Sequence, residues 1–161
     1  MNCARCGRPM RRGRENYLYR ECGLTTVTLV GIEVVRCRHC GEHEVIIPKI
    51  EQLHRIIAVT LARKVPRLAP EEIRFLRKHL GWSGVEFAAH LGVSAETVSR
   101  WENGAAAMGP AAERLLRLAA LTRGPSAGDS LTVLKQVARE RPAHQPLHVS
   151  ITRGVWSARA A

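Results

Sequence analysis

The sequence predicts an α+β protein: a small β-rich domain at the N-terminus, a linking helix, and an all-α domain of five helices. Two observations predict this class. Residues 1–47 contain all five cysteines and most of the β-branched runs. From residue 48 onward, apolar residues recur at helical spacing, and alanine and leucine are frequent. We therefore expect boundaries at 1–47 for the β-rich domain, 48–69 for the linking helix and linker, 70–140 for the helical domain and 141–161 for a C-terminal tail.

Composition narrows the class of partner. The chain has 161 residues, 45% hydrophobic and 24% charged, as in a globular protein. Its net charge of +11 favours a polyanionic partner, nucleic acid first, although Arg-rich chains are also common in GC-rich genomes. No apolar run approaches the ~20 residues that cross a bilayer, and residues 1–6 hold no apolar signal core. We therefore expect a cytoplasmic protein without membrane contact.

The β-type sequence lies between the cysteine pairs. Residues 25–30 and 32–35 are β-branched runs separated by Gly31, which predicts two strands. Residues 17–19, with two tyrosines, are a candidate for another strand.

Four of the cysteines form two matching CxxCG sequences, Cys3 with Cys6 and Cys37 with Cys40. Each such turn brings two thiolates toward one ion, and glycine permits the tight turn. Two turns make a tetrahedral site of four sulfurs, which suits one Zn²⁺. Because no coordination position is left for water, we expect a structural ion. A redox CxxC favours a βαβ setting, and an iron–sulfur centre favours other spacings.

Three residues near these pairs are weaker candidates. Cys22 is expected to be a structural or surface residue outside the metal site. His39 and His43 are expected to be solvated or to support the ligands, with replacement of a thiolate by either as the alternative.

The linking segment has a helical pattern. Four apolar residues lie on one helical face: Ile50, Leu53, Ile57 and Leu61. They predict a helix with Pro48 in its first turn, ending before Pro66.

Start and stop signals divide residues 70–121 into four helices. The predicted starts are Pro70, Ser83, Ser94 and Pro110, and the predicted ends include Gly92 and Gly104. Ser83 and Glu86 have the spacing of a capping box.

The C-terminal residues are less regular. Leu131, Leu134 and Val137 predict a fifth helix after Asp129 or Ser130. We expect the rest to be loop or tail. Residues 147–151 alternate as a strand does, but no pairing partner is evident.

Residues 87–104 carry the most specific motif. If Val93, Val98 and Trp101 face inward, then four polar side chains face outward: Glu96, Ser99, Arg100 and Asn103. This stretch resembles the helix-turn-helix of the phage-repressor-like, Xre-type family, which ends in a string like residues 99–104. The resemblance covers residues 70–121 and implies a lambda-repressor-like domain whose second motif helix enters the DNA major groove.

The candidate DNA-contacting residues are Ser83, Ala95, Glu96, Thr97, Ser99, Arg100 and Asn103. Arg100 is the first candidate for base contact, because a guanidinium bonds guanine O6 and N7 together; a phosphate contact or a solvated charge is the alternative. Glu96 can accept from cytosine N4, and Ala95 can touch a thymine methyl.

The phosphate contacts need another source, because many family members carry glutamine where this chain has Gly84. Ser83, with Lys78 or Arg77, is expected to replace that contact. We expect Trp101 in the core, and Glu102 as the structural partner of a nearby arginine.

Together, the two parts resemble the MqsA-like antitoxin family, which joins a YgiT-type zinc finger to an Xre-type helix-turn-helix. The resemblance covers residues 1–121. It implies a zinc domain that neutralises an mRNA-cleaving toxin, and a homodimer that represses its own operon at a palindromic operator. Arg100 matches a family DNA-reading arginine, but Glu96 stands where an asparagine reads DNA, and the C-terminus is longer.

The alternative is a stand-alone Xre-type regulator whose zinc ribbon mediates protein–protein contacts. An enzyme is not expected, because the sequence shows no Ser/His/Asp set, phosphate loop or open metal site.

Overall fold

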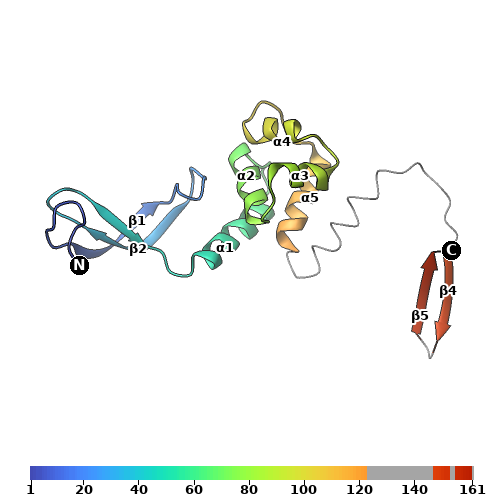
Figure 1. Ribbon diagram of the computed structural model, residues 1–161, viewed down its shortest axis with the longest axis horizontal. Coiled ribbons are helices and arrows are strands. Elements are labelled where there is room, and N and C mark those ends of the chain that lie inside the picture. Colours follow the sequence, from blue (N-terminus) through green and yellow to red (C-terminus); the bar gives the residue numbers. More distant parts are fainter. Residues whose placement is uncertain (123–146, 153–154, 161) are drawn as a thin grey trace.

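The computed structural model describes residues 1–122, and beyond them the backbone of 147–152 and 155–160. The elements in chain order are β1 (Arg11–Leu18), β2 (Thr28–Arg36), β3 (His43–Ile46), α1 (Ile50–Arg63), α2 (Pro70–His79), α3 (Gly84–Leu91), α4 (Ala95–Glu102), α5 (Pro110–Leu121), β4 (Leu147–Thr152) and β5 (Val155–Ala160) (Figure 1). A small sheet followed by five helices confirms the α+β class. No helix of the described chain is both long and apolar enough to span a bilayer.

The N-terminal sheet is antiparallel, with β2 between β1 and β3. The prediction of two strands divided at Gly31 was wrong, because β2 runs through this glycine. The β1–β2 register shifts between Glu15 and Tyr17, and Gly31 adopts φ 62° opposite that shift. Its N–H donates to Asn16 Oδ1 at 3.1 Å. Gly31 therefore forms a β-bulge, which bends the strand without ending it.

Two further strand expectations need correction. The strand expected at residues 17–19 was misplaced, because residues 17 and 18 are the end of β1, which begins at Arg11, and Tyr19 lies outside it. The four-residue strand β3 was not predicted; it pairs with β2 from Arg36↔His43 to Glu33↔Ile46.

The start of α1 also differs from the prediction. Pro48 lies before the helix and not in its first turn, because Lys49 is the N-cap, with φ 49° and ψ 52°. A residue in this left-handed region interrupts the helical conformation, so the helix begins at Ile50.

The other helices begin and end where local signals predict. Pro70 and Pro110 are the first residues of α2 and α5. The Ser83 side chain accepts from Glu86 N, and Ser83 N donates to the Glu86 carboxylate, which confirms the capping box. Ser94 caps α4, and Gly92, at φ 66°, ends α3.

The five helices share one hydrophobic core. Leu76, Phe87 and Leu116 are fully buried, and α1 contributes Ile57 and Ala58. Helix α1 packs against α2 and α5, so it is part of the helical body. The fifth helix expected near Leu131–Val137 falls on residues that the structure does not describe.

The N-terminal unit is joined to this helical body through residues 19–27. Leu24 is only 1% exposed and belongs to the same core cluster as α1 and α2. The Tyr19 hydroxyl lies 3.0 Å from His54 Nε2 on α1. Thr25 donates to Glu71 Oε1 on α2 through both its N–H and its hydroxyl. Apolar and polar contacts thus fix the sheet to two helices.

The C-terminal strands form an antiparallel hairpin, from Leu147↔Ala160 to Thr152↔Val155. The expectation of a loop or tail here was wrong, because the strand at residues 147–152 has a partner in β5.

Candidate metal centre and nucleic-acid interface

The four cysteines of the CxxCG pairs converge at the N-terminal unit. The Sγ atoms of Cys3, Cys6, Cys37 and Cys40 all lie within 4.8 Å of one another. The Cys3–Cys40 and Cys6–Cys37 Sγ atoms are 3.5 Å apart in each pair. A zinc ion with Zn–S bonds of ~2.3 Å would set these separations at about 3.8 Å. The sulfurs therefore already have nearly the spacing of a tetrahedral site.

The two cysteine turns are built alike. Gly7 N donates to Cys3 O at 2.8 Å, and Gly41 N donates to Cys37 O at 3.0 Å. Both glycines adopt the left-handed conformation, at φ 70° and 77°. A side chain at either glycine would strain the turn, so this position needs glycine.

The four thiols do not share one acidity. The N–H groups of Cys40 and His39, hydrogen-bonded to the Cys37 sulfur, lower the pKa of the Cys37 thiol to about 6. The Glu42 N–H acts to lower the pKa of Cys40, but burial and the bonds with the other three thiols outweigh it and raise that pKa to about 12. Metal ligands must be deprotonated, so a cation bound here would have to displace the protons that the crowded sulfurs share. A closed set of four sulfurs fits a structural metal site.

The neighbouring candidates lie outside this cluster. Cys22 is half-buried against the core, and its Sγ lies 3.4 Å from Tyr19 O. His39 is exposed, and His43 lies beside the Tyr17 ring, with centroids 6.2 Å apart. None of the three belongs to the thiol cluster.

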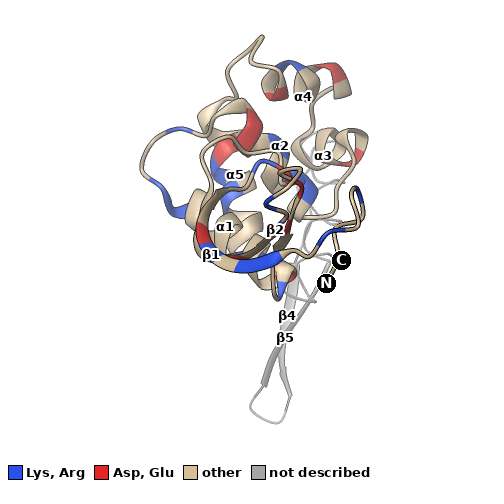
Figure 2. Cartoon of the chain, turned by 90° about the vertical axis from the view of Figure 1, so that its left-hand side faces the viewer, with Lys and Arg blue, Asp and Glu red and all other residues tan. Residues whose placement is uncertain are grey.

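Helices α3 and α4 form the predicted helix-turn-helix. Val98 and Trp101 are 2% and 7% exposed and pack into the core, so the opposite face of α4 points outward. Four polar residues on that side are exposed: Glu96, Ser99, Arg100 and Asn103. Helix α4 lies at one extremity of the helical body in both views (Figures 1 and 2). This is the geometry that a groove-reading helix requires.

The individual candidates differ in how far their side chains are already engaged. Thr97 is half-buried, and its hydroxyl lies 2.9 Å from Ser94 Oγ. The Asn103 carboxamide oxygen accepts from Ala105 N, which leaves its amide donors for another partner. Arg100 is exposed, and no ion pair joins it to another residue of the range 1–122.

Ser83 and Ala95 stand at the first turns of the two motif helices. Ser83 caps α3 and is exposed, while Ala95, also exposed, is the first residue of α4. Both residues were expected to contact DNA, and both lie on the exposed side of the motif.

Glu102 holds the motif from behind, as expected. Arg77 Nε and Nη2 contact its two carboxylate oxygens at 2.5 and 3.0 Å. Arg74 Nη2 donates to the Glu102 carbonyl at 2.9 Å. Arg77 also bonds Trp82 O and is only 12% exposed. Arg77 is therefore not available to phosphate, and Lys78, which is exposed, remains the candidate on α2.

The basic excess does not lie on the helix-turn-helix. Residues 70–122 carry six lysines and arginines and six acids, so the +11 charge lies in residues 1–69 and 123–161. Basic residues are visible along β1 in Figure 2. Attraction to a polyanion therefore comes mainly from outside the motif that would contact bases.

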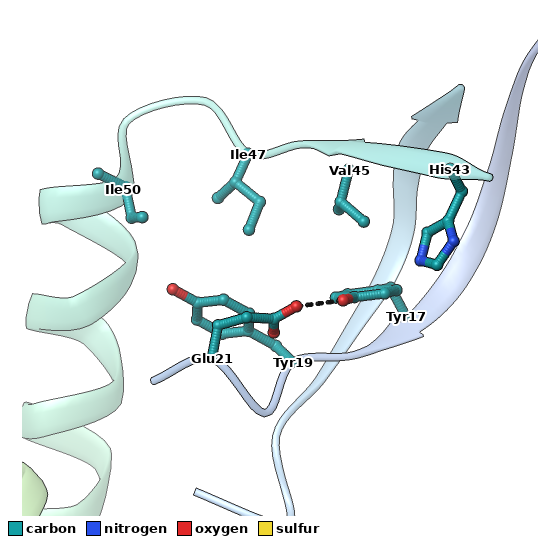
Figure 3. Close-up of a pocket in the computed structure, with 7 residues that line it drawn as sticks. All are labelled: Tyr17, Tyr19, Glu21, His43, Val45, Ile47 and Ile50. Atoms are coloured by element: carbon teal, nitrogen blue, oxygen red, sulfur yellow. Dashed lines mark hydrogen bonds between the residues drawn. The ribbon is translucent and has the colours of Figure 1, made fainter. Parts of the chain in front are cut away.

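A pocket that the sequence did not predict lies on the N-terminal unit. It has a volume of about 400 Å³ and is lined by Tyr17, Tyr19, Glu21, His43, Val45, Ile47 and Ile50 (Figure 3). The two tyrosines at positions 17 and 19 were a signal, because alternate strand residues share a face.

Comparison with known families supports the helix-turn-helix assignment. Residues 73–126 match the family model described as Helix-turn-helix, which supports a DNA-binding transcriptional regulator. The match does not extend to the thiol cluster. A search of curated proteins found no match to the chain.

Proposed function

We propose that this protein represses transcription by binding a palindromic operator as a homodimer, with α4 of each copy in the major groove. The observation that carries the proposal is the exposed polar face of α4, opposite buried Val98 and Trp101. Glu102 at the end of that helix is fixed by Arg77, so the reading face is rigidly presented.

Arg100 supplies the main base contact. Its guanidinium is free to bond guanine O6 and N7, a pairing that distinguishes guanine from other bases. Glu96 on the preceding turn accepts from cytosine and repels phosphate, so it selects sequence without adding general affinity. Ser83 and Asn103 donate to phosphate, while Ala95, Thr97 and Ser99 lie close to the bases.

We further propose that the thiol cluster holds one structural Zn²⁺. The convergence of the four sulfurs and their spacing support this. The sheet it closes is small, and most of β1 is exposed, so the ion would contribute much of the folding free energy of this unit.

For the N-terminal unit we propose an antitoxin role, in which it binds and neutralises an mRNA-cleaving toxin. Support comes from the resemblance of the two-part arrangement and from the open pocket on the N-terminal unit. A stand-alone regulator, whose zinc unit contacts another protein, is the competing function.

The experiment has two parts. Footprinting on the DNA upstream of the gene should show two protected half-sites about 34 Å apart; a single half-site would contradict the dimer. Co-expression with the neighbouring gene should rescue growth if that gene encodes an mRNA-cleaving toxin. Growth inhibition that this protein does not relieve, or a neighbour without RNase activity, would favour the stand-alone regulator.

A further inference from the structure

A slot on the N-terminal unit lies between aromatic and aliphatic walls. Figure 3 shows the rings of Tyr17 and Tyr19 on one side, with Val45, Ile47 and Ile50 pointing toward them from the other. Its volume of about 400 Å³ leaves room for a side chain from another molecule. Flat rings facing branched aliphatic groups suit an extended hydrocarbon chain.

The slot continues along the start of α1. A second pocket, of about 520 Å³, shares Ile47 and Ile50 and extends over Lys49, Glu51 and Gln52. Ile50 is 45% exposed, and the neighbouring Ile46 is 37% exposed. The two pockets together form a groove longer than one side chain needs, which points to a stretch of polypeptide.

A carboxylate lies at the edge of the slot. The Tyr17 hydroxyl donates to Glu21 Oε1, and this bond is the main cause that holds the pKa of Glu21 below its usual value. Glu21 is exposed and therefore ionised at neutral pH, with further lone pairs for a second donor. A purely apolar guest would make no ion pair or hydrogen bond with the Glu21 carboxylate.

The backbone beside the slot is strained. Lys49 is the sole residue other than glycine with positive φ in the described chain, at φ 49° and ψ 52°. Residues other than glycine rarely adopt this backbone conformation, and those that do are found more often at functional sites. Here the unusual turn sets the position of Ile50 against the slot.

We propose that this slot receives a lysine or arginine side chain from an extended segment of a partner protein. The aliphatic stem lies between the Tyr17 ring and the isoleucines, with the buried Tyr19 ring as the floor, and the cationic head meets Glu21 and the Tyr17 ring. The two pockets are lined by the carboxylates of Glu21 and Glu51 and by a single lysine, Lys49, so their charge disfavours nucleic acid at this surface. The inference rests on the proposed protein-binding role of the N-terminal unit, and it identifies the contact surface.

The test uses the full-length, zinc-loaded protein and three probes followed by amide NMR. They are acetyl-Ile-Arg-Ile-amide, its glutamine counterpart acetyl-Ile-Gln-Ile-amide, and n-butylguanidinium. We expect the arginine peptide to shift resonances at the slot and to bind about tenfold more tightly than the glutamine peptide. Equal binding of both peptides would overturn the proposal. If n-butylguanidinium bound as tightly as the arginine peptide, the site would serve a small free cation instead.

Matched variants separate the slot from its surroundings. Glu21→Gln should remove the preference for the arginine peptide, whereas Glu44→Gln, at an exposed acid of β3 outside the slot, should keep it. Ile50→Ser should weaken both peptides, whereas Ile56→Ser, at another exposed isoleucine of α1, should not. Equal effects within either pair would overturn the proposal. If the protein still protects its operator and rescues growth but fails the peptide test, the proposed contact surface is wrong and the proposed function stands.

Discussion

The base contact of Arg100 can be tested against Arg114, because replacing either arginine by alanine removes the same charge. Both arginines are exposed, one on α4 and one on α5. Arg100→Ala should cost ~1–3 kcal/mol of operator binding and remove the preference at one base pair. Arg114→Ala removes the same charge and should leave every base preference intact. Binding to a set of operators with single substitutions measures both, and unchanged selectivity in the first variant would exclude Arg100 as a base contact.

Glu102 should matter for stability more than its position near the surface suggests. Its side chain is 9% exposed, and that of its partner Arg77 is 12% exposed. Glu102→Ala would leave a largely buried guanidinium without its carboxylate, at a cost of about 3 kcal/mol. Glu33→Ala breaks the more exposed pair with Arg12 and should cost less than about 1 kcal/mol. Urea denaturation of both variants compares them; equal costs would refute the structural role of Glu102.

At the scale of elements, a buried carboxylate connects α5 to the linker before α2. Glu113 is 4% exposed, pairs with Arg67 and Arg117, and accepts from Leu68 N at 3.1 Å. Burial acts to raise the pKa of Glu113, but the bonds from Arg117 and Arg67 outweigh it and hold the pKa below 4.5. The native state therefore binds this proton less readily than the unfolded state.

The sign of the resulting pH dependence follows. The stabilisation is present above the unfolded pKa, near 4.5, and is lost as pH falls through the lower native value. Glu113→Gln should therefore be less stable than the native sequence at pH 7, with the difference shrinking below pH 4.5. Urea denaturation of both proteins at pH 7 and at a pH below 4.5 gives this difference. The metal-free forms are compared at both pH values, and the metal-saturated forms at pH 7. A gap that widened in acid would contradict the assignment.

Elements fixed by local chemistry were predictable, and elements fixed by pairing were not. Ser83, Ser94 and Gly92 place the ends of α3 and α4 because a cap needs only its own turn. Strand β3 has four residues and depends on β2 for its hydrogen bonds. Strand β5 contains two alanines, which have low strand propensity, so its pairing with β4 is what reveals it.

The candidate site shows the same division. The CxxCG spacing and the periodicity of α4 are local signals, and the structure brings the four sulfurs together and leaves the polar face of α4 exposed, as expected. The engagement of Arg77 depends on Glu102, which is 25 residues away. The pocket needs residues from β1, β3 and α1 at once, which no local pattern specifies.

At the scale of the whole molecule, the N-terminal unit and the helical body share a core through Leu24. Cys37→Ser should release the proposed ion and unfold the sheet. The helices should remain, but they should lose the ~2–3 kcal/mol that burial of Leu24 contributes. Cys22→Ser, outside the cluster, should keep the metal. Zinc content and circular dichroism melts measure both effects, and an unchanged melting temperature of the helices in Cys37→Ser would show two independent units.

Residues 19–27 give the chain a property that neither half would have alone. The segment begins between the two cysteine turns and ends its path against α1 and α2, where Tyr19 meets His54 and Thr25 meets Glu71. Loss of the proposed ion at one end would therefore loosen the support of the helices at the other. If the protein represses transcription with zinc bound, as proposed, zinc starvation should derepress its promoters before the protein itself disappears.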